Sequence, residues 1–228
     1  MSASAKPRLA GRQPSVRGRG APGEDQAQHA GCWVSRDKGG FLLSPLAFRK
    51  AASDDVERIA ALHADSWRRH YRGAFADSFL DGDVEADRSA VWSARLAPTA
   101  DRSGSATILA ELDDRLLGFI HVAFDDDPRW GSLIDNLHVR HDQRRTGIGR
   151  QLLVRGAMAV TARAINHGMY LWVLAQNVAA QRFYEAHGGA VTETEPTHAP
   201  GGDPSRVNGA SRSLRIAWSD AARVVAAD

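Results

Sequence analysis

Cysteine is almost absent from this 228-residue sequence, and so are long apolar stretches. The single Cys32 cannot form an internal disulfide, and no group of Cys and His residues has the spacing of a zinc site. No stretch approaches the roughly 20 apolar residues of a membrane-spanning helix, and the N-terminus lacks a continuous apolar signal core. We therefore expect a cytoplasmic protein of a reducing compartment, with no metal and no membrane contact.

Large apolar residues are also scarce in the first 31 residues, which are rich in Gly, Ala, Ser, Pro and Arg. Such a segment cannot offset the entropy lost on ordering, so residues 1–45 are predicted to be a disordered basic extension. Seven basic and three acidic residues give it a charge of +4, against +2 for the whole chain. It could be a solvated extension, a weak contact for nucleic acid or membrane, or an Arg-rich transit peptide. A nucleic-acid partner rests on this extension alone and is the less favoured option.

The rest of the chain has the composition of one soluble globular domain, which we place at residues 46–220, with 221–228 as a C-terminal tail. Ser53, Asp54 and Asp55 predict the start of a first helix, and Asp113 and Asp114 predict a hairpin turn. Hydrophobic periodicity predicts helices and strands in alternation. The helices are expected near 56–72, 78–80, 84–96, 147–160 and 177–187, and the strands near 46–51, 106–112, 116–124, 132–139, 169–175, 190–195 and 213–218.

The stretch from Ser132 to Val160 organises this pattern. It reads as a buried strand, a short basic loop with two glycines, and a long helix with one apolar face. Glycine lets the backbone turn sharply and approach a ligand, and the first amides of a helix have no acceptor within it. Such a helix start is an anion site, most often for phosphate.

Two common phosphate loops do not match this stretch. The dinucleotide fingerprint needs a third glycine where Leu152 stands, and the nucleotide triphosphatase loop needs Gly-Lys-Ser/Thr, which is absent. The pattern Arg144-x-x-Gly147-x-Gly149 instead resembles the acetyl-coenzyme A pyrophosphate loop of the GNAT superfamily of N-acetyltransferases.

A second GNAT-like motif follows the first about thirty residues downstream. It begins with Asn177 at a predicted strand end, continues with a short helix that carries Phe183 and Tyr184, and closes at Gly188 and Gly189. Two such motifs in order identify the chain as a GNAT superfamily member. The resemblance implies an α/β GNAT fold, in which a mixed, mostly antiparallel sheet is splayed at the cofactor strand and flanked by helices.

The resemblance also implies roles for individual residues. Acetyl-coenzyme A would be the cosubstrate, and Tyr184 would face its sulfur as general acid. Trp67 and Tyr71 would border the acceptor pocket, unless, four apart on a helix, they only pack in the core. The other residues expected to hold the cofactor, by backbone or side chain, are Leu137, His138, Val139, Arg144, Arg145, Thr146, Gly147, Ile148, Gly149, Arg150 and Asn177.

The sequence offers more than one candidate for the general base. Ribosomal-protein acetyltransferases of the family carry a glutamate five residues before the asparagine, and here that position is Trp172. Asp135 and His138 on the central strand are the local candidates, and strand alternation predicts that they lie on opposite faces. Each could instead have a purely structural role, and a water relay would need neither.

These observations favour an N-acetyltransferase that moves an acetyl group to a primary amine by direct attack. The acceptor would be a small molecule or the N-terminus of a peptide or protein. The alternative is a GNAT-like module that binds acyl-coenzyme A without turnover, which the absence of the glutamate at Trp172 favours. The acceptor amine and the oligomeric state, a homodimer included, are left open by the sequence.

Overall fold

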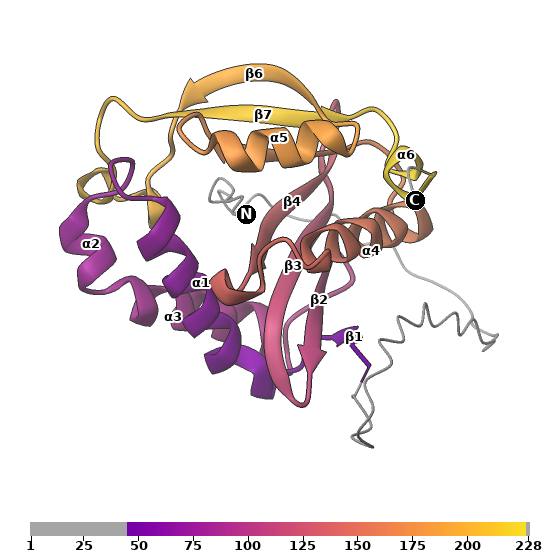
Figure 1. Ribbon diagram of the computed structural model, residues 1–228, viewed down its shortest axis with the longest axis horizontal. Helices are drawn as coiled ribbons and strands as arrows, with labels where there is room; N and C mark the ends of the chain where they lie inside the picture. The colour runs from indigo at the N-terminus through magenta and orange to yellow at the C-terminus, as the bar shows by residue number, and fades with distance from the viewer. Residues whose placement is uncertain (1–44, 227–228) are drawn as a thin grey trace, which may run out of the picture. The chain divides into compact units, whose positions relative to one another are not determined.

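The computed structural model describes residues 45–226. The predicted extension, residues 1–45, therefore lies almost entirely outside the described residues. Within them the helices and strands alternate as the periodicity predicts (Figure 1). The turn between the second and third strands uses Asp113 and Asp114, both with positive φ (49° and 59°), as expected for a tight hairpin.

Seven strands form one sheet with the order β1-β2-β3-β4-β5-β7-β6. Neighbouring strands are antiparallel except for β4 and β5, which are parallel. The predicted mixed, mostly antiparallel sheet is thus confirmed. Its strands are β1 (Ala47–Lys50), β2 (Ser105–Leu112), β3 (Arg115–Asp127), β4 (Gly131–Val139), β5 (Met169–Leu174), β6 (Ala190–Pro196) and β7 (Arg212–Trp218).

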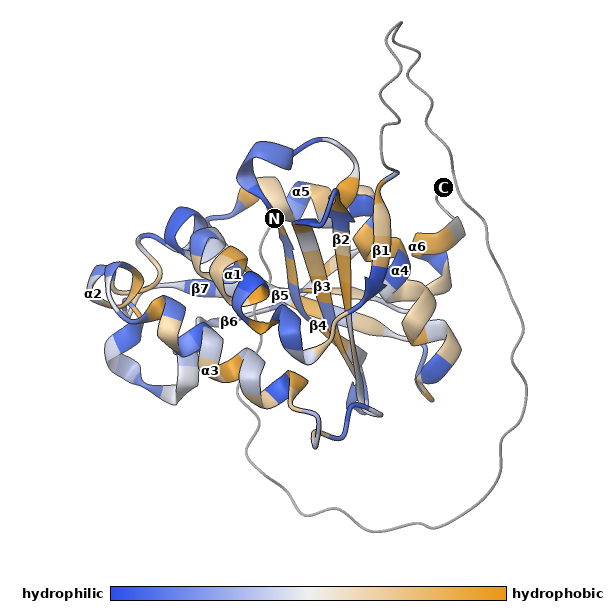
Figure 2. Ribbon diagram, turned by 90° about the horizontal axis from the view of Figure 1, so that it is seen from below, coloured by the Kyte–Doolittle hydropathy of each residue, from blue (hydrophilic) through white to orange (hydrophobic). Residues whose placement is uncertain are grey.

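Helices cover both faces of this sheet, and Figure 2 shows α1 and α3 on the side of β2–β4 opposite to α4. Apolar residues of α4, such as Leu152 and Val160, pack with Ile120 and Ile134 of the sheet. On the other face Trp92 of α3 packs with Phe119. The helices are α1 (Val56–His70), α2 (Asp77–Asp81), α3 (Val84–Leu96), α4 (Ile148–Arg163), α5 (Val178–Ala186) and α6 (Ala222–Ala226).

The sheet opens between its two parallel strands. β4 and β5 pair only at Ser132 with Met169 and at Leu133 with Tyr170, after which β5 pairs with β7 alone. Between residues 134 and 139, the β5-facing edge of β4 has no strand partner among the described residues. Backbone amides and carbonyls are obligatory hydrogen-bonding groups, so this edge can bind an extended ligand as an added strand would. The predicted splay at the cofactor strand is confirmed.

A β-bulge in β4 corrects one prediction. His121 pairs with Asn136 and Val122 pairs with Ile134, so Asp135 is an extra residue without its own partner on β3. A bulge breaks the two-residue alternation of side chains. Asp135 therefore lies on the same face as His138, the face covered by α1 and α3, and the expectation of opposite faces is wrong.

The ends of the domain also differ in detail from the prediction. The described residues 221–226 are not merely a tail, because Ala221 and, in α6, Val224 are buried in the core. At the other end, residues 53–55 form a separate 3₁₀ turn before α1. The Asp55 carboxylate there accepts a hydrogen bond from the Ala52 amide at 2.8 Å.

Candidate functional site

The loop between β4 and α4 has the backbone geometry of an anion site. Arg145 (φ 63°) and Gly147 (φ 86°) both have left-handed conformations, and an added Cβ at Gly147 would meet no atom within 4 Å. Gln151 donates to the Gly147 carbonyl at 3.1 Å and starts the helical ladder. The three preceding amides of α4, at residues 148–150, therefore have no acceptor within the helix.

Positive charge surrounds this helix start. Arg144 and Arg145 are exposed in the loop, and Arg150 is half-buried in the first turn of α4. The helix dipole adds positive potential at the same point. The loop directly follows β4, so the open strand edge leads to an anion site, which is the arrangement that a long ligand with a phosphate group needs.

Tyr184 on α5 carries a hydroxyl that does not take part in the hydrogen bonds of the described part of the fold. The residue is fully buried, and its ring packs against Trp218 with centroids 6.1 Å apart. Its hydroxyl has no hydrogen-bond partner among the described residues. Burial, and to a lesser degree the nearby Tyr71 phenol, raise the pKa of Tyr184 well above its usual value. Leaving a buried hydroxyl unpaired costs about 1–3 kcal/mol, so a bound group that accepts this hydrogen bond would recover that cost.

Asn177 begins α5. Its side-chain oxygen accepts a hydrogen bond from the Ala180 amide at 3.1 Å, so the oxygen is committed to capping the helix. The side-chain nitrogen remains as the hydrogen-bond donor of this amide. The sequence predicts a ligand-binding role for Asn177, and the structure adds this capping role.

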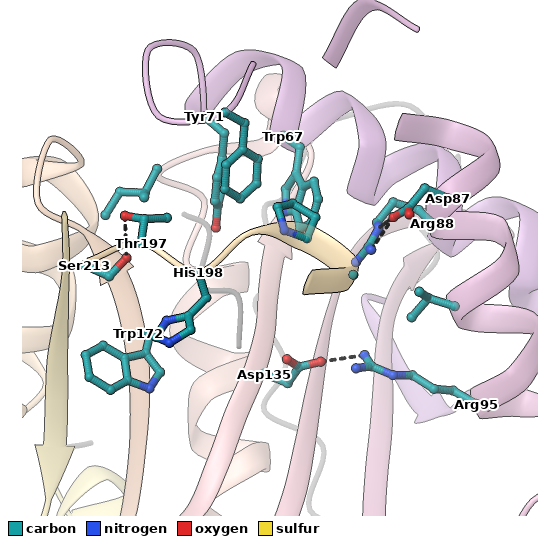
Figure 3. Close-up of a pocket in the computed structure, with 15 residues that line it drawn as sticks. Trp67, Tyr71, Asp87, Arg88, Arg95, Asp135, Trp172, Thr197, His198 and Ser213 are labelled. Atoms are coloured by element: carbon teal, nitrogen blue, oxygen red, sulfur yellow. Dashed lines mark hydrogen bonds and ion pairs between the residues drawn. The ribbon is translucent and has the colours of Figure 1, made fainter. Parts of the chain in front are cut away.

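A cavity of about 170 Å³ lies on the face of the sheet that α1 and α3 cover (Figure 3). Trp67 of α1 and Tyr71, which directly follows α1, form one wall, and Trp172 of β5 contributes to the opposite side. Trp67 and Tyr71 are also packed together with ring centroids 5.3 Å apart. Core packing and pocket lining, which were alternatives from the sequence, are therefore both observed.

The floor of this cavity carries Asp135, whose carboxylate forms an ion pair with Arg95 at 2.5 Å (Figure 3). Burial alone would raise the pKa of Asp135, but the charge of Arg95 and its hydrogen bond outweigh burial, and the pKa is lowered. Asp135 is accordingly a carboxylate at neutral pH, and it is better suited to hold a cation than to take up a proton.

His138 does not line the cavity. It is fully buried under α1, where its Nδ1 lies 2.8 Å from Ser66 Oγ and its Nε2 lies 3.3 Å from Asn136 Oδ1. The amide oxygen of Asn136 can only accept, so His138 Nε2 carries the proton and Nδ1 accepts from Ser66. Burial lowers the pKa of His138 well below its usual value, which keeps the ring neutral.

A histidine that the sequence did not point to does line the cavity. His198 stands in the loop between β6 and β7, and Figure 3 shows its ring beside Trp172 and near Asp135. Residues 196–209 are rich in Pro, Gly and Asp, a composition that predicts only a connecting loop. The one available signal was an isolated imidazole in that loop, since histidine is the side-chain type that titrates near neutral pH.

Residues 45–226 contain no group of three or more His, Cys, Asp or Glu side chains that could hold a metal ion. None of the helices in that part of the chain is long and apolar enough to cross a membrane.

Comparison with known proteins decides the family. The sequence model of the acetyltransferase (GNAT) family matches residues 56–189, which is more than half of the chain. The protein belongs to the GNAT acetyltransferase family. It is therefore an acyltransferase, and the matched region includes the β4–α4 loop, Asn177 and Tyr184 of this GNAT domain.

Relatives of the GNAT domain agree with this assignment. An uncharacterized N-acetyltransferase of Bacillus subtilis (strain 168), YuaI, is 27% identical over 146 residues, covering 61% of this chain and 77% of the relative. PaiA N-acetyltransferase from Thermoplasma acidophilum, solved in complex with coenzyme A, superposes with a TM-score of 0.57 at 19% identity. That match covers 76% of this chain and 99% of PaiA.

A third relative is YncA from Salmonella typhimurium, solved with its cofactor acetyl-CoA. It superposes with a TM-score of 0.56 at 18% identity, over 77% of this chain and 94% of YncA. At these identities the structural likeness shows the shared GNAT fold.

Proposed function

We propose that this enzyme transfers an acetyl group from acetyl-coenzyme A to the primary amine of a small molecule or peptide by direct attack. The observation that carries the proposal is the fully buried Tyr184 hydroxyl, which has no partner among the described residues. The relatives solved with coenzyme A and with acetyl-CoA support the choice of donor.

The residues present fit this donor. The amides at the start of α4, with Arg144 and Arg145 beside them, would hold its pyrophosphate. The open edge of β4 between residues 134 and 139 would pair with its pantetheine arm, and the amide of Leu137, His138 or Val139 would hold the oxyanion. Asn177 would donate its side-chain nitrogen to the same arm.

In the reaction the amine nitrogen forms a bond to the thioester carbon, and the carbon–sulfur bond then breaks to release a thiolate. Because burial raises the pKa of Tyr184, its hydroxyl keeps its proton at neutral pH. Tyr184 would then stabilise the leaving thiolate by donating a hydrogen bond, and the thiolate would take its proton from solvent afterwards. This replaces the simpler role of a full general acid.

The amine must lose a proton before or during the attack. An alkylamine with a pKa near 10.4 costs about 4–5 kcal/mol to deprotonate at pH 7. Of the ionisable groups that line the cavity, the imidazole of His198 is the one suited to accept that proton, since the pKa of Asp135 is lowered and His138 lies outside the cavity. Asp135 would hold the incoming ammonium.

A screen of primary amines and short peptides for release of coenzyme A from acetyl-coenzyme A tests the proposal. At least one acceptor should raise the release rate above the rate of thioester hydrolysis, and His198→Ala should lower that rate about 10²-fold. Tight binding of acetyl-coenzyme A without release for any acceptor would contradict the proposal and would point to binding without turnover.

A further inference from the structure

A guanidinium group in the cavity is not explained by acetyl transfer alone. Arg88 of α3 lines the cavity although the residue is only 7% exposed. Its Nε and Nη2 donate to Asp87. Its Nη1 makes no hydrogen bond with residues 45–226. A buried guanidinium normally has its donors paired, so this N–H group is available to a ligand.

Arg88 shares its one carboxylate partner within residues 45–226 with another arginine. Its partner Asp87 is shared with Arg206, which pairs with the other carboxylate oxygen at 2.5 Å. Arg95 pairs with Asp135 at 2.5 Å. Arg206 lies outside the cavity lining and pairs with Asp203 as well, at 3.4 Å, whereas Arg88 has only the shared Asp87 among the described residues. The charge of the largely buried Arg88 is therefore only partly balanced. A bound anion would neutralise it.

The shape of the site holds this guanidinium in one orientation. The Trp67 ring stacks on Arg88 with the guanidinium carbon 4.3 Å from the ring centroid, which fixes its plane. Asp87 occupies Nε and Nη2, so the Nη1 end of the guanidinium is the part that can donate to a ligand carboxylate. The cavity of about 170 Å³ is smaller than the ~300 Å³ typical of drug-sized pockets, so it suits a small molecule.

From this geometry we propose that the acceptor is a small amine that also carries a carboxylate, bound with its carboxylate at Arg88 and its ammonium at Asp135. The aromatic rings of Trp67, Tyr71 and Trp172 contact the carbon skeleton between the two charges. The role of this molecule as acceptor rests on the proposed acetyl transfer. Its preferred binding over the corresponding amide can be measured without turnover.

The experiment compares acids with their amides. The protein α-amino acids, β-alanine and γ-aminobutyrate, each beside its carboxamide, are titrated by calorimetry into the full chain without acetyl-coenzyme A. The same pairs are then assayed for release of coenzyme A. At least one acid should bind about tenfold or more tightly than its amide, because a charged pair to the buried Arg88 is lost in the amide.

Variants of Arg88 and of a control arginine test which residue causes the preference for the acid. Arg88→Gln should reduce the difference between acid and amide to within about threefold, whereas Arg69→Gln, which removes an exposed guanidinium paired with Asp65, should keep it. Arg88→Lys, which keeps the charge but not the fork, should give an intermediate preference. If Arg88→Gln fails to fold, the difference between acid and amide binding, measured in the wild type and in Arg88→Lys, still tests the role of Arg88.

Equal binding of every acid and its amide, or a preference that survives in folded Arg88→Gln, would overturn this inference. Failure of the proposed function looks different, since it would appear as an acid preference in binding with no release of coenzyme A for any pair.

Discussion

The side-chain amide of Asn136 donates a hydrogen bond to the Asp135 carboxylate at 2.6 Å, across the two residues of the bulge in β4. The other end of the same amide accepts from His138, which in turn accepts from Ser66. A buried chain of hydrogen bonds therefore runs from α1 to the one carboxylate on the floor of the cavity. Its expected purpose is to hold Asp135 in a fixed orientation toward the acceptor.

The first prediction follows from this chain. Asn136→Leu leaves the His138 N–H unpaired and removes one donor from Asp135, which should lower the free energy of unfolding by about 1–3 kcal/mol. It should also raise KM for the acceptor more than it lowers kcat, because Asp135 is proposed to bind rather than react. Urea unfolding and steady-state kinetics measure the two effects.

Ser66→Ala is the matched control for Asn136→Leu. It removes the hydroxyl that His138 accepts from but keeps the Asn136–Asp135 hydrogen bond. This variant should lose stability with little change in KM. A KM that rises equally in both variants would show that the chain acts only through stability.

The sequence predicted the helices and strands well, because the spacing of apolar residues that marks each element lies within that element. The apolar stripe of α4 and the strand pattern at Ser132–Val139 need no knowledge of distant residues. The bulge at Asp135 could not be read in this way, because it depends on how β4 registers against β3.

The cavity was harder still to predict, since six separated segments line it. The pairing of Arg95 with Asp135 and the placement of His198 beside Trp172 come from packing between elements. The sequence could predict Tyr184 and the glycine loop only because each sits in a short contiguous motif. Residues such as Arg88, which lie in no motif, become visible only when the helices are packed.

The second prediction concerns the anion loop. Gly147→Val places a branched side chain at a φ of 86°, over the amides that open α4. Affinity for acetyl-coenzyme A should fall at least about tenfold, because the backbone can no longer approach the pyrophosphate closely. Gly104→Val is the control, since an added Cβ there also meets no atom within 4 Å and its φ lies outside the left-handed range. Calorimetry that finds unchanged affinity in folded Gly147→Val would remove the loop from the cofactor site.

The third prediction concerns acid stability. His63, His121 and His138 are buried, and burial lowers the pKa of His121 to about 3 and the pKa values of the other two well below their usual range. The unfolded chain takes up these protons near pH 6.5, whereas the folded chain does not. Stability is therefore fully present above pH 6.5 and falls as the pH is lowered, by up to ~1.4 kcal/mol per pH unit for each histidine.

Urea unfolding at pH 7.5, 6.0 and 5.0 measures this slope. His121→Gln should make it shallower, while replacing the exposed His141 by Gln should leave it as in the wild type. A free energy of unfolding that stays constant between pH 7.5 and 5.0 would contradict the assignment of neutral buried rings.

The most direct test of the account is Tyr184→Phe, which keeps the ring and removes only the hydroxyl. Since that hydroxyl is buried without a partner among the described residues, its loss should leave the melting temperature unchanged or raise it. Turnover with the best acceptor should fall by about 10²-fold, while the affinity for acetyl-coenzyme A changes little. The decisive measurement is the ratio of kcat to the wild-type value at matched cofactor saturation. A stable Tyr184→Phe enzyme with about a hundredth of the wild-type kcat supports the role of Tyr184 at the leaving sulfur, and a kcat equal to that of the wild type would contradict it.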